Sequence, residues 1–79
     1  MDNLVEVASF AFPNEADVLE SLLQKENIKY FLSNSVISPG IDIRLMVDSE
    51  DIPQVVEIMK EGGFENYLND NIIANFLNN

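Results

Sequence analysis

The chain has 79 residues, and its 14 Asp and Glu against 4 Lys and Arg give a formal net charge of −10. Nucleic acids and anionic membranes are bound mainly through basic side chains, so neither is an expected partner. The chain contains no Cys and no His, which excludes disulfides and thiolate metal sites and removes the usual general bases.

Length and composition predict one soluble domain. The chain is too short for two domains, and its 47% apolar content is typical of a globular protein. Asp2 and Glu6 interrupt the basic and apolar stretch that a secretory signal needs, and no apolar run is long enough to span a bilayer. We therefore expect a cytoplasmic protein.

The first predicted unit is a strand, a helix and a second strand. Leu4 to Phe10, LVEVASF, has the β-branched residues of a half-buried strand. Pro13 to Asn34 then indicates a helix that leads into the strand KYFLS, with Asn14 as its cap and Asp17 in a capping-box position. Asn27 ends the helix, because Asn tolerates the left-handed backbone conformation. The buried stripe of the helix comprises Ala16, Leu19, Leu22 and Leu23.

The segment from Ser33 to Gly40 is predicted to be a loop longer than a tight hairpin needs. Pro39 and Gly40 mark a turn in it, and Val36 and Ile37 are its apolar residues. They either tuck under the sheet edge or form a lip that faces a ligand or a protein, since binding residues often lie on such loops.

The chain matches itself without a gap when it is shifted by 36 positions. The shift predicts a second strand–helix–strand unit, with a strand from Ile41 to Val47, Pro53 in the first turn of a helix, and a short last strand from Glu65 to Leu68. It also places Gly63 opposite Asn27, so both helices end at a residue that tolerates a positive φ. Paired apolar residues include Val5 with Ile41, Leu19 with Val55, Leu23 with Met59 and Ile28 with Phe64.

This order of elements predicts an α+β fold. Right-handed crossovers lead to a ferredoxin-like βαββαβ sandwich, in which two helices cover one face of a four-stranded antiparallel sheet. The predicted domain spans residues 1–68. Residues 69–79 form an Asn-rich tail with a short amphipathic helix that Asp70 caps.

The uncovered face of the sheet is the main candidate interface. Glu6 and Arg44 are expected to pair on it across neighbouring strands, and a surface that mixes charged and apolar residues generally binds a partner. Phe10, Arg44 and Met46 are its candidate interface residues. Strict alternation places on this face Leu4, Glu6, Ala8, Phe10, Asp42, Arg44 and Met46, with one or more of Tyr30, Phe31 and Leu32.

The tail helix supplies a second set of candidate residues. Ile72, Ile73, Phe76 and Leu77 fall on one side of it, and a helix this short is unstable alone in water. It either packs on its own domain, contacts a second copy of the chain, or frays. Val36 and Ile37 complete the candidate interface.

No constellation of residues indicates catalysis. The six Ser residues have no recognisable base nearby. Asp48 to Asp51, DSED, has oxygen ligands that suit Mg²⁺ or Ca²⁺, but it lacks the spacing of an EF-hand loop, and acidic residues at a helix start need no metal. We therefore expect no enzymatic activity, no cofactor and no metal.

The segment NEADVLESLLQKENIKYFLSN is similar to the pattern E-A-x-x-L-x-x-L-L…I-x-x-x-L of a small prokaryotic family of unknown function, labelled "putative prokaryotic signal transducing protein". IRLMVDSEDIPQVVEIM resembles the second strand and helix of that family, and the likeness covers about Leu4 to Met59. The resemblance implies a bacterial protein with a ferredoxin-like fold akin to the PII signalling proteins, and it carries no established activity. ATP binding is not carried over, because only Ser33 to Gly40 stands in place of the long PII loop. The matching residues are Glu15, Ala16, Leu19, Leu22, Leu23, Ile28 and Leu32.

These observations predict a non-catalytic binding or regulatory module. Its partner is a protein or a small molecule, engaged through the open sheet face or the loop at residues 33–40. The alternative is a structural or oligomerisation domain, such as a homodimer, that has no small-molecule ligand.

Overall fold

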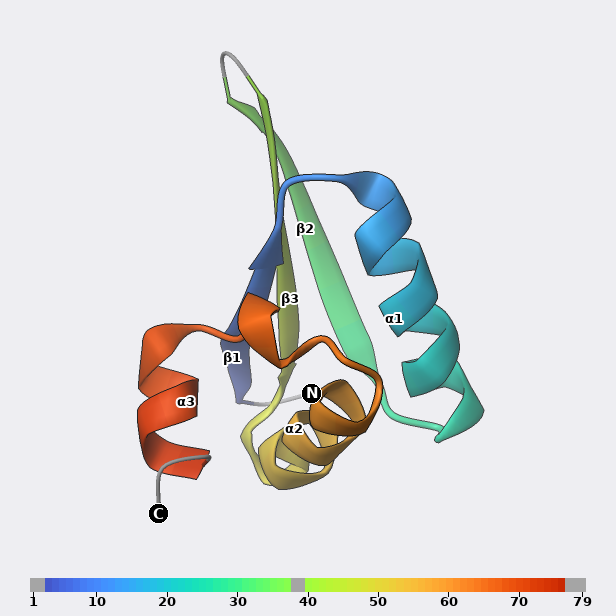
Figure 1. Ribbon diagram of the computed structural model, residues 1–79, viewed down its shortest axis with the longest axis vertical. Coiled ribbons are helices and arrows are strands. Elements are labelled where there is room, and N and C mark those ends of the chain that lie inside the picture. Colours follow the sequence, from blue (N-terminus) through green and yellow to red (C-terminus); the bar gives the residue numbers. More distant parts are fainter. Residues whose placement is uncertain (1–2, 38–39, 77–79) are drawn as a thin grey trace.

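Three strands and three α-helices make up the computed structural model, which describes residues 3–37 and 40–76, without the side chains of 35–41 (Figure 1). The strands form one antiparallel sheet in the order β1-β3-β2. Helices α1 and α2 pack beside each other on one face of it, and α3 lies next to β1 (Figure 1). The elements in chain order are β1 (Leu4–Phe10), α1 (Pro13–Lys25), β2 (Tyr30–Ile37), β3 (Gly40–Asp48), the 3₁₀ turn η1 (Ser49–Asp51), α2 (Ile52–Glu61), the 3₁₀ turn η2 (Glu65–Tyr67) and α3 (Asp70–Phe76).

The α+β class is confirmed, but the four-stranded ferredoxin-like sheet is not. The predicted strand at Glu65–Leu68 is instead the turn η2, and Leu68 alone forms an isolated antiparallel bridge with Ala8. The local sequence ENYLND disfavours a strand, because Asn and Asp are depleted in strands. The ring of Tyr67 also packs 4.9 Å from that of Phe10, which favours a turn at this point.

The ends of α1 and α2 confirm one part of the predicted repeat, the equivalence of Asn27 and Gly63, although the second unit lacks its last strand. Asn27 has a φ of 59° and Gly63 a φ of 82°, as the 36-residue shift predicts. Both helices close with the hydrogen bonds of a Schellman motif. The equivalent bonds are Ile28 N–H to Leu23 O at 3.0 Å and Phe64 N–H to Met59 O at 2.7 Å.

The starts of the two helices are only partly as expected. Pro53 does lie in the first turn of α2, and Asp48 accepts a hydrogen bond from the Glu50 N–H at 3.0 Å in the preceding turn. The predicted cap at Asn14 is wrong. Helix α1 begins at Pro13, two residues before the start that a cap at Asn14 implies, because the fixed φ of Pro suits the first helical position.

Strands β2 and β3 form a hairpin that extends beyond the end of β1 (Figure 1). The predicted loop at residues 33–40 is therefore wrong for most of its length, since Val36 pairs with Ile41 and Ile37 with Gly40. Val and Ile have high strand propensity, so β2 continues to Ile37. Residues 38–39 lie outside the described residues.

The core lies between the sheet and the helices, and it includes one residue of α3. Ile72 is only 3% exposed, so α3 packs on its own domain in this structure. No polar or charged side chain is buried among the described residues. The core comprises Val7, Ala8, Phe10, Ala16, Leu19, Leu23, Ile28, Ile43, Leu45, Val47, Ile52, Val55, Val56, Met59, Leu68 and Ile72.

Candidate interaction surface

A β-bulge at Val7 decides which side chains of β1 reach the open sheet face, meaning the face opposite α1 and α2. Glu6 lies opposite Met46, but Ala8 lies opposite Leu45, so Val7 is an extra residue without a partner on β3. A bulge breaks the alternation of side chains along a strand. Residues after Val7 therefore lie on the face opposite to the one that strict alternation predicts.

Ala8 and Phe10 consequently belong to the core. They are 0% and 3% exposed, and the prediction that they lie on the open sheet face is wrong. Phe10 is thereby removed from the exposed candidate residues, and Ser9 takes a place on the open face. The adjacent apolar pair Val7-Ala8, which interrupts the alternating pattern, is the one sequence signal of the bulge.

The open sheet face is built from all three strands. Directly opposed residues of an antiparallel pair lie on the same face, so the strand register assigns each side chain to one face of the sheet. Arg44 and Met46 lie on the open face, where the sequence places them. The described residues of this face are Leu4, Glu6, Ser9, Phe31, Ser33, Asp42, Arg44, Met46 and Asp48.

Arg44 is held at the centre of this face by two carboxylates. Its Nη1 lies 3.0 Å from Glu6 Oε1 and its Nε 2.7 Å from Asp42 Oδ2, so the predicted Glu6–Arg44 pair is confirmed. The hydrogen bond and charge of Asp42, followed by the charge of Glu6, raise the pKa of Arg44 above its ordinary value. Asn69 steadies the arrangement, since its Nδ2 donates to Glu6 Oε2 at 2.8 Å.

Apolar side chains lie next to this charged group. Phe31 and Met46 are cross-strand neighbours, and Phe31 is 52% exposed. Leu4, on β1, is 44% exposed. Arg, Met and aromatic residues are enriched in protein interfaces, so this combination is typical of a surface that binds another protein.

The other candidate residues are spread over the molecule. Ile72 is buried, Ile73 is partly buried and Phe76 is 38% exposed, so the three do not form one exposed surface. Leu77 lies outside the described residues, and the side chains of Val36 and Ile37 are not described. Their role as interface residues stays a prediction.

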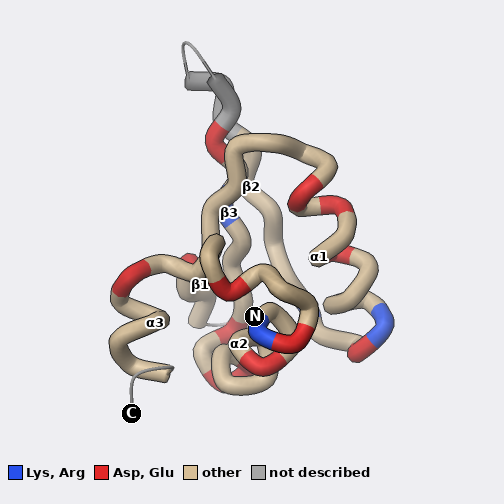
Figure 2. The backbone as a smooth tube through the Cα atoms, in the orientation of Figure 1, with Lys and Arg blue, Asp and Glu red and all other residues tan. Residues whose placement is uncertain are grey.

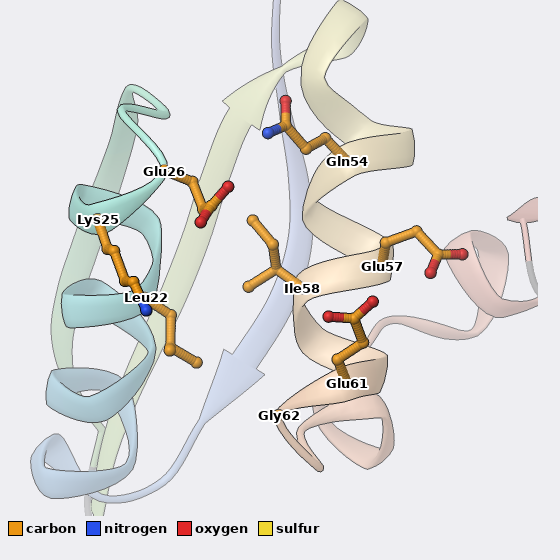
Figure 3. Close-up of a pocket in the computed structure, with 8 residues that line it drawn as sticks. All are labelled: Leu22, Lys25, Glu26, Gln54, Glu57, Ile58, Glu61 and Gly62. Carbon is orange, nitrogen blue, oxygen red and sulfur yellow. The ribbon is translucent and has the colours of Figure 1, made fainter.

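A groove between α1 and α2, with a volume of about 420 Å³, was not predicted from the sequence (Figure 3). Leu22 and Ile58 point toward each other across it (Figure 3). No group of three or more carboxylates among the described residues is arranged to hold a metal ion. Such a groove depends on how two helices pack, and no local pattern signals it. Its lining comprises Leu22, Lys25, Glu26, Gln54, Glu57, Ile58, Glu61 and Gly62.

The chain was compared with known protein families. The family described as "putative prokaryotic signal transducing protein" matches residues 4–63, which run from β1 to the residue that closes α2. No curated protein and no solved structure matches the chain. Within the described residues, no helix is long and apolar enough to cross a membrane.

Proposed function

Because the chain belongs to the family described as "putative prokaryotic signal transducing protein", we propose that it is a non-catalytic regulatory module that binds a protein through the open sheet face. The supporting observation is that Phe31 and Arg44 are exposed on that face, with the partly exposed Met46 next to both. These residues come from neighbouring strands and form a broad surface. Small-molecule sites, by contrast, are enclosed and concave.

The ion pairs of Arg44 fit this role. An arginine that is already oriented by Glu6 and Asp42 loses little conformational freedom when a partner covers it, and such preorganisation favours affinity. The proposal does not include catalysis, because the chain has no His and no Cys to supply the usual bases and nucleophiles.

A photo-crosslinking amino acid at Met46 tests the proposal in cells of the source organism. Met46 lies on the central strand β3, so an adduct from this position reports on the face rather than on a sheet edge. The matched control is the same amino acid at Val18, which is 54% exposed on α1. We expect one adduct with a different protein from Met46 and none from Val18.

A second variant shows whether the ion pairs matter. Arg44→Met removes the charge, and we expect it to abolish the Met46 adduct while the circular dichroism spectrum stays unchanged, since exposed ion pairs contribute little to stability. Lys25→Met, on α1, is the control and keeps the adduct. Absence of an adduct from Met46, or equal adducts from Met46 and Val18, contradicts the proposed function.

A further inference from the structure

The geometry points to a second interaction surface, which is independent of the open sheet face. We propose that the outer edge of β2 pairs in antiparallel orientation with the same edge of a second copy of this chain. The two three-stranded sheets then join into one continuous sheet across a twofold axis.

Strand β2 has an unpaired backbone edge. Its residues Tyr30–Ile37 pair with β3 along their whole length, and among the described residues they make no other backbone hydrogen bond. In an antiparallel strand, half of the N–H and C=O groups point away from the paired neighbour. Eight residues therefore present a regular row of free donors and acceptors.

The opposite edge of the sheet is protected, whereas β2 is not. Natural edge strands are blocked by bulges, charges, Pro or covering segments. β1 has the bulge at Val7, and the segment at Leu68 and Asn69 covers it, with Asn69 N–H donating to Val7 O at 2.9 Å. β2 has a continuous register, no Pro and no charged residue.

The charge distribution favours a second copy of this chain as the partner of the free β2 edge. Residues 30–41 contain no charged side chain, which is the longest such run in a chain of net charge −10, whose acidic residues are red in Figure 2. Two copies of so acidic a protein repel each other, and the repulsion is smallest where an uncharged edge meets its own copy. An antiparallel pair of identical edges is also self-complementary about a twofold axis.

The hairpin beyond β1 gives a further reason. Past the pair of Phe10 and Ile43, the sheet consists of β2 and β3 alone, and a two-stranded ribbon is only marginally stable in water. A second β2 adds strands to this part of the sheet. It also gives Phe31, which is 52% exposed on the edge strand, cross-strand neighbours to pack against.

Sedimentation analysis of the purified chain tests the existence of the dimer. We expect a dimer whose dissociation constant falls as the salt concentration rises, because salt screens the repulsion between the acidic copies. Amide hydrogen exchange is measured in parallel. Protection of residues 30–37 is expected to increase with protein concentration, while protection of α1 stays constant. A monomer at all concentrations overturns the proposal.

Two matched variants locate the interface. Ser33 and Ser9 both lie opposite Arg44 on the open face, one on β2 and the other on β1. Ser33→Glu brings like charges together across paired edges, so we expect about a tenfold or greater loss of dimer affinity. Ser9→Glu is expected to dimerise as the parent does, and circular dichroism confirms that both fold. If both variants dissociate and β2 exchange does not depend on concentration, the sheets stack face to face and the edge proposal is wrong.

Discussion

Tyr67 donates a hydrogen bond from its hydroxyl to a carboxylate oxygen of Glu15, 52 residues earlier in the chain. This bond ties η2, the turn that stands in place of a fourth strand, to the first turn of α1. The Tyr67 ring packs against two other aromatic rings, with centroid distances of 4.9 Å to Phe10 and 6.0 Å to Phe64. The hydrogen bond to Glu15 and, secondarily, burial raise the pKa of Tyr67 above its ordinary value of 10.0.

The raised pKa predicts a loss of stability in alkaline solution. Below pH 10.0 both states hold the proton and the stabilisation is complete. At higher pH the unfolded chain loses the proton first, so the free energy of unfolding falls until the pH passes the folded-state pKa. Urea denaturation between neutral pH and pH values above 10.0 measures this fall.

Tyr67→Phe is expected to be less stable at neutral pH and to lose less stability in the alkaline range. Part of the fall remains in the variant, because burial and the hydrogen bond to Glu20 also raise the pKa of Tyr30. An alkaline fall equal to that of the parent chain would show that the Tyr67–Glu15 hydrogen bond does not stabilise the fold.

The bulge at Val7 predicts effects of very different size for two neighbouring substitutions. Ala8→Asp places a carboxylate in the core, where residue 8 is 0% exposed, and we expect a loss of about 3–5 kcal/mol in the free energy of unfolding. Ser9→Asp places a carboxylate on the open face near Arg44, and we expect it to change the free energy of unfolding by about 0.5 kcal/mol or less. Strict alternation along β1 predicts the reverse order, so chemical denaturation of the two variants distinguishes the registers.

The positive φ of Gly63, at the end of α2, predicts that different substitutions at this position lower the stability by different amounts. Gly63 has a φ of 82°, and a Cβ at this position would meet no atom within 4 Å, so the cost of a side chain is purely conformational. Gly63→Ala should lose about 1–2 kcal/mol of unfolding free energy. Gly63→Asn should lose less, because Asn tolerates this conformation and occupies the equivalent position at Asn27. Equal losses in urea denaturation would contradict this explanation.

The packing of α3 predicts that its apolar residues differ in importance. Ile72 is 3% exposed and Phe76 is 38% exposed. We expect Ile72→Ala to cost about 2–5 kcal/mol, as for other buried Ile residues, and Phe76→Ala to cost about 1 kcal/mol or less. Thermal unfolding of both variants provides the measurement. If Ile72→Ala is tolerated without loss, α3 does not contribute to the core.

The helices of both units could be predicted because their signals are local. Apolar residues at helical spacing mark the buried stripes, and Asn27 and Gly63 terminate helices through their own backbone preferences. The Arg44–Glu6 pair could also be predicted, since it needs only two neighbouring strands and the correct side of each. The family resemblance, which rests on the same core positions, agrees with the match at residues 4–63.

The position of Phe10 and the fate of residues 65–68 could not be predicted in this way. A bulge at Val7 moves every later side chain of β1 to the other face, and no residue type requires it there. Residues 65–68 form a turn instead of a strand because Tyr67 contacts Glu15 and Phe10, which are far from it in the sequence. The groove between α1 and α2 likewise depends on helix packing.

The amino-acid sequence by itself determined the strand–helix units, the points at which both helices end, and the acidic character of the surface, because each depends on residues close together in the chain or on composition alone. Only the tertiary structure decided the number of strands, the side of the sheet that Ala8 and Phe10 face, and the free edge of β2. These features depend on contacts between residues far apart in sequence, whose energies compete with local preferences of similar size.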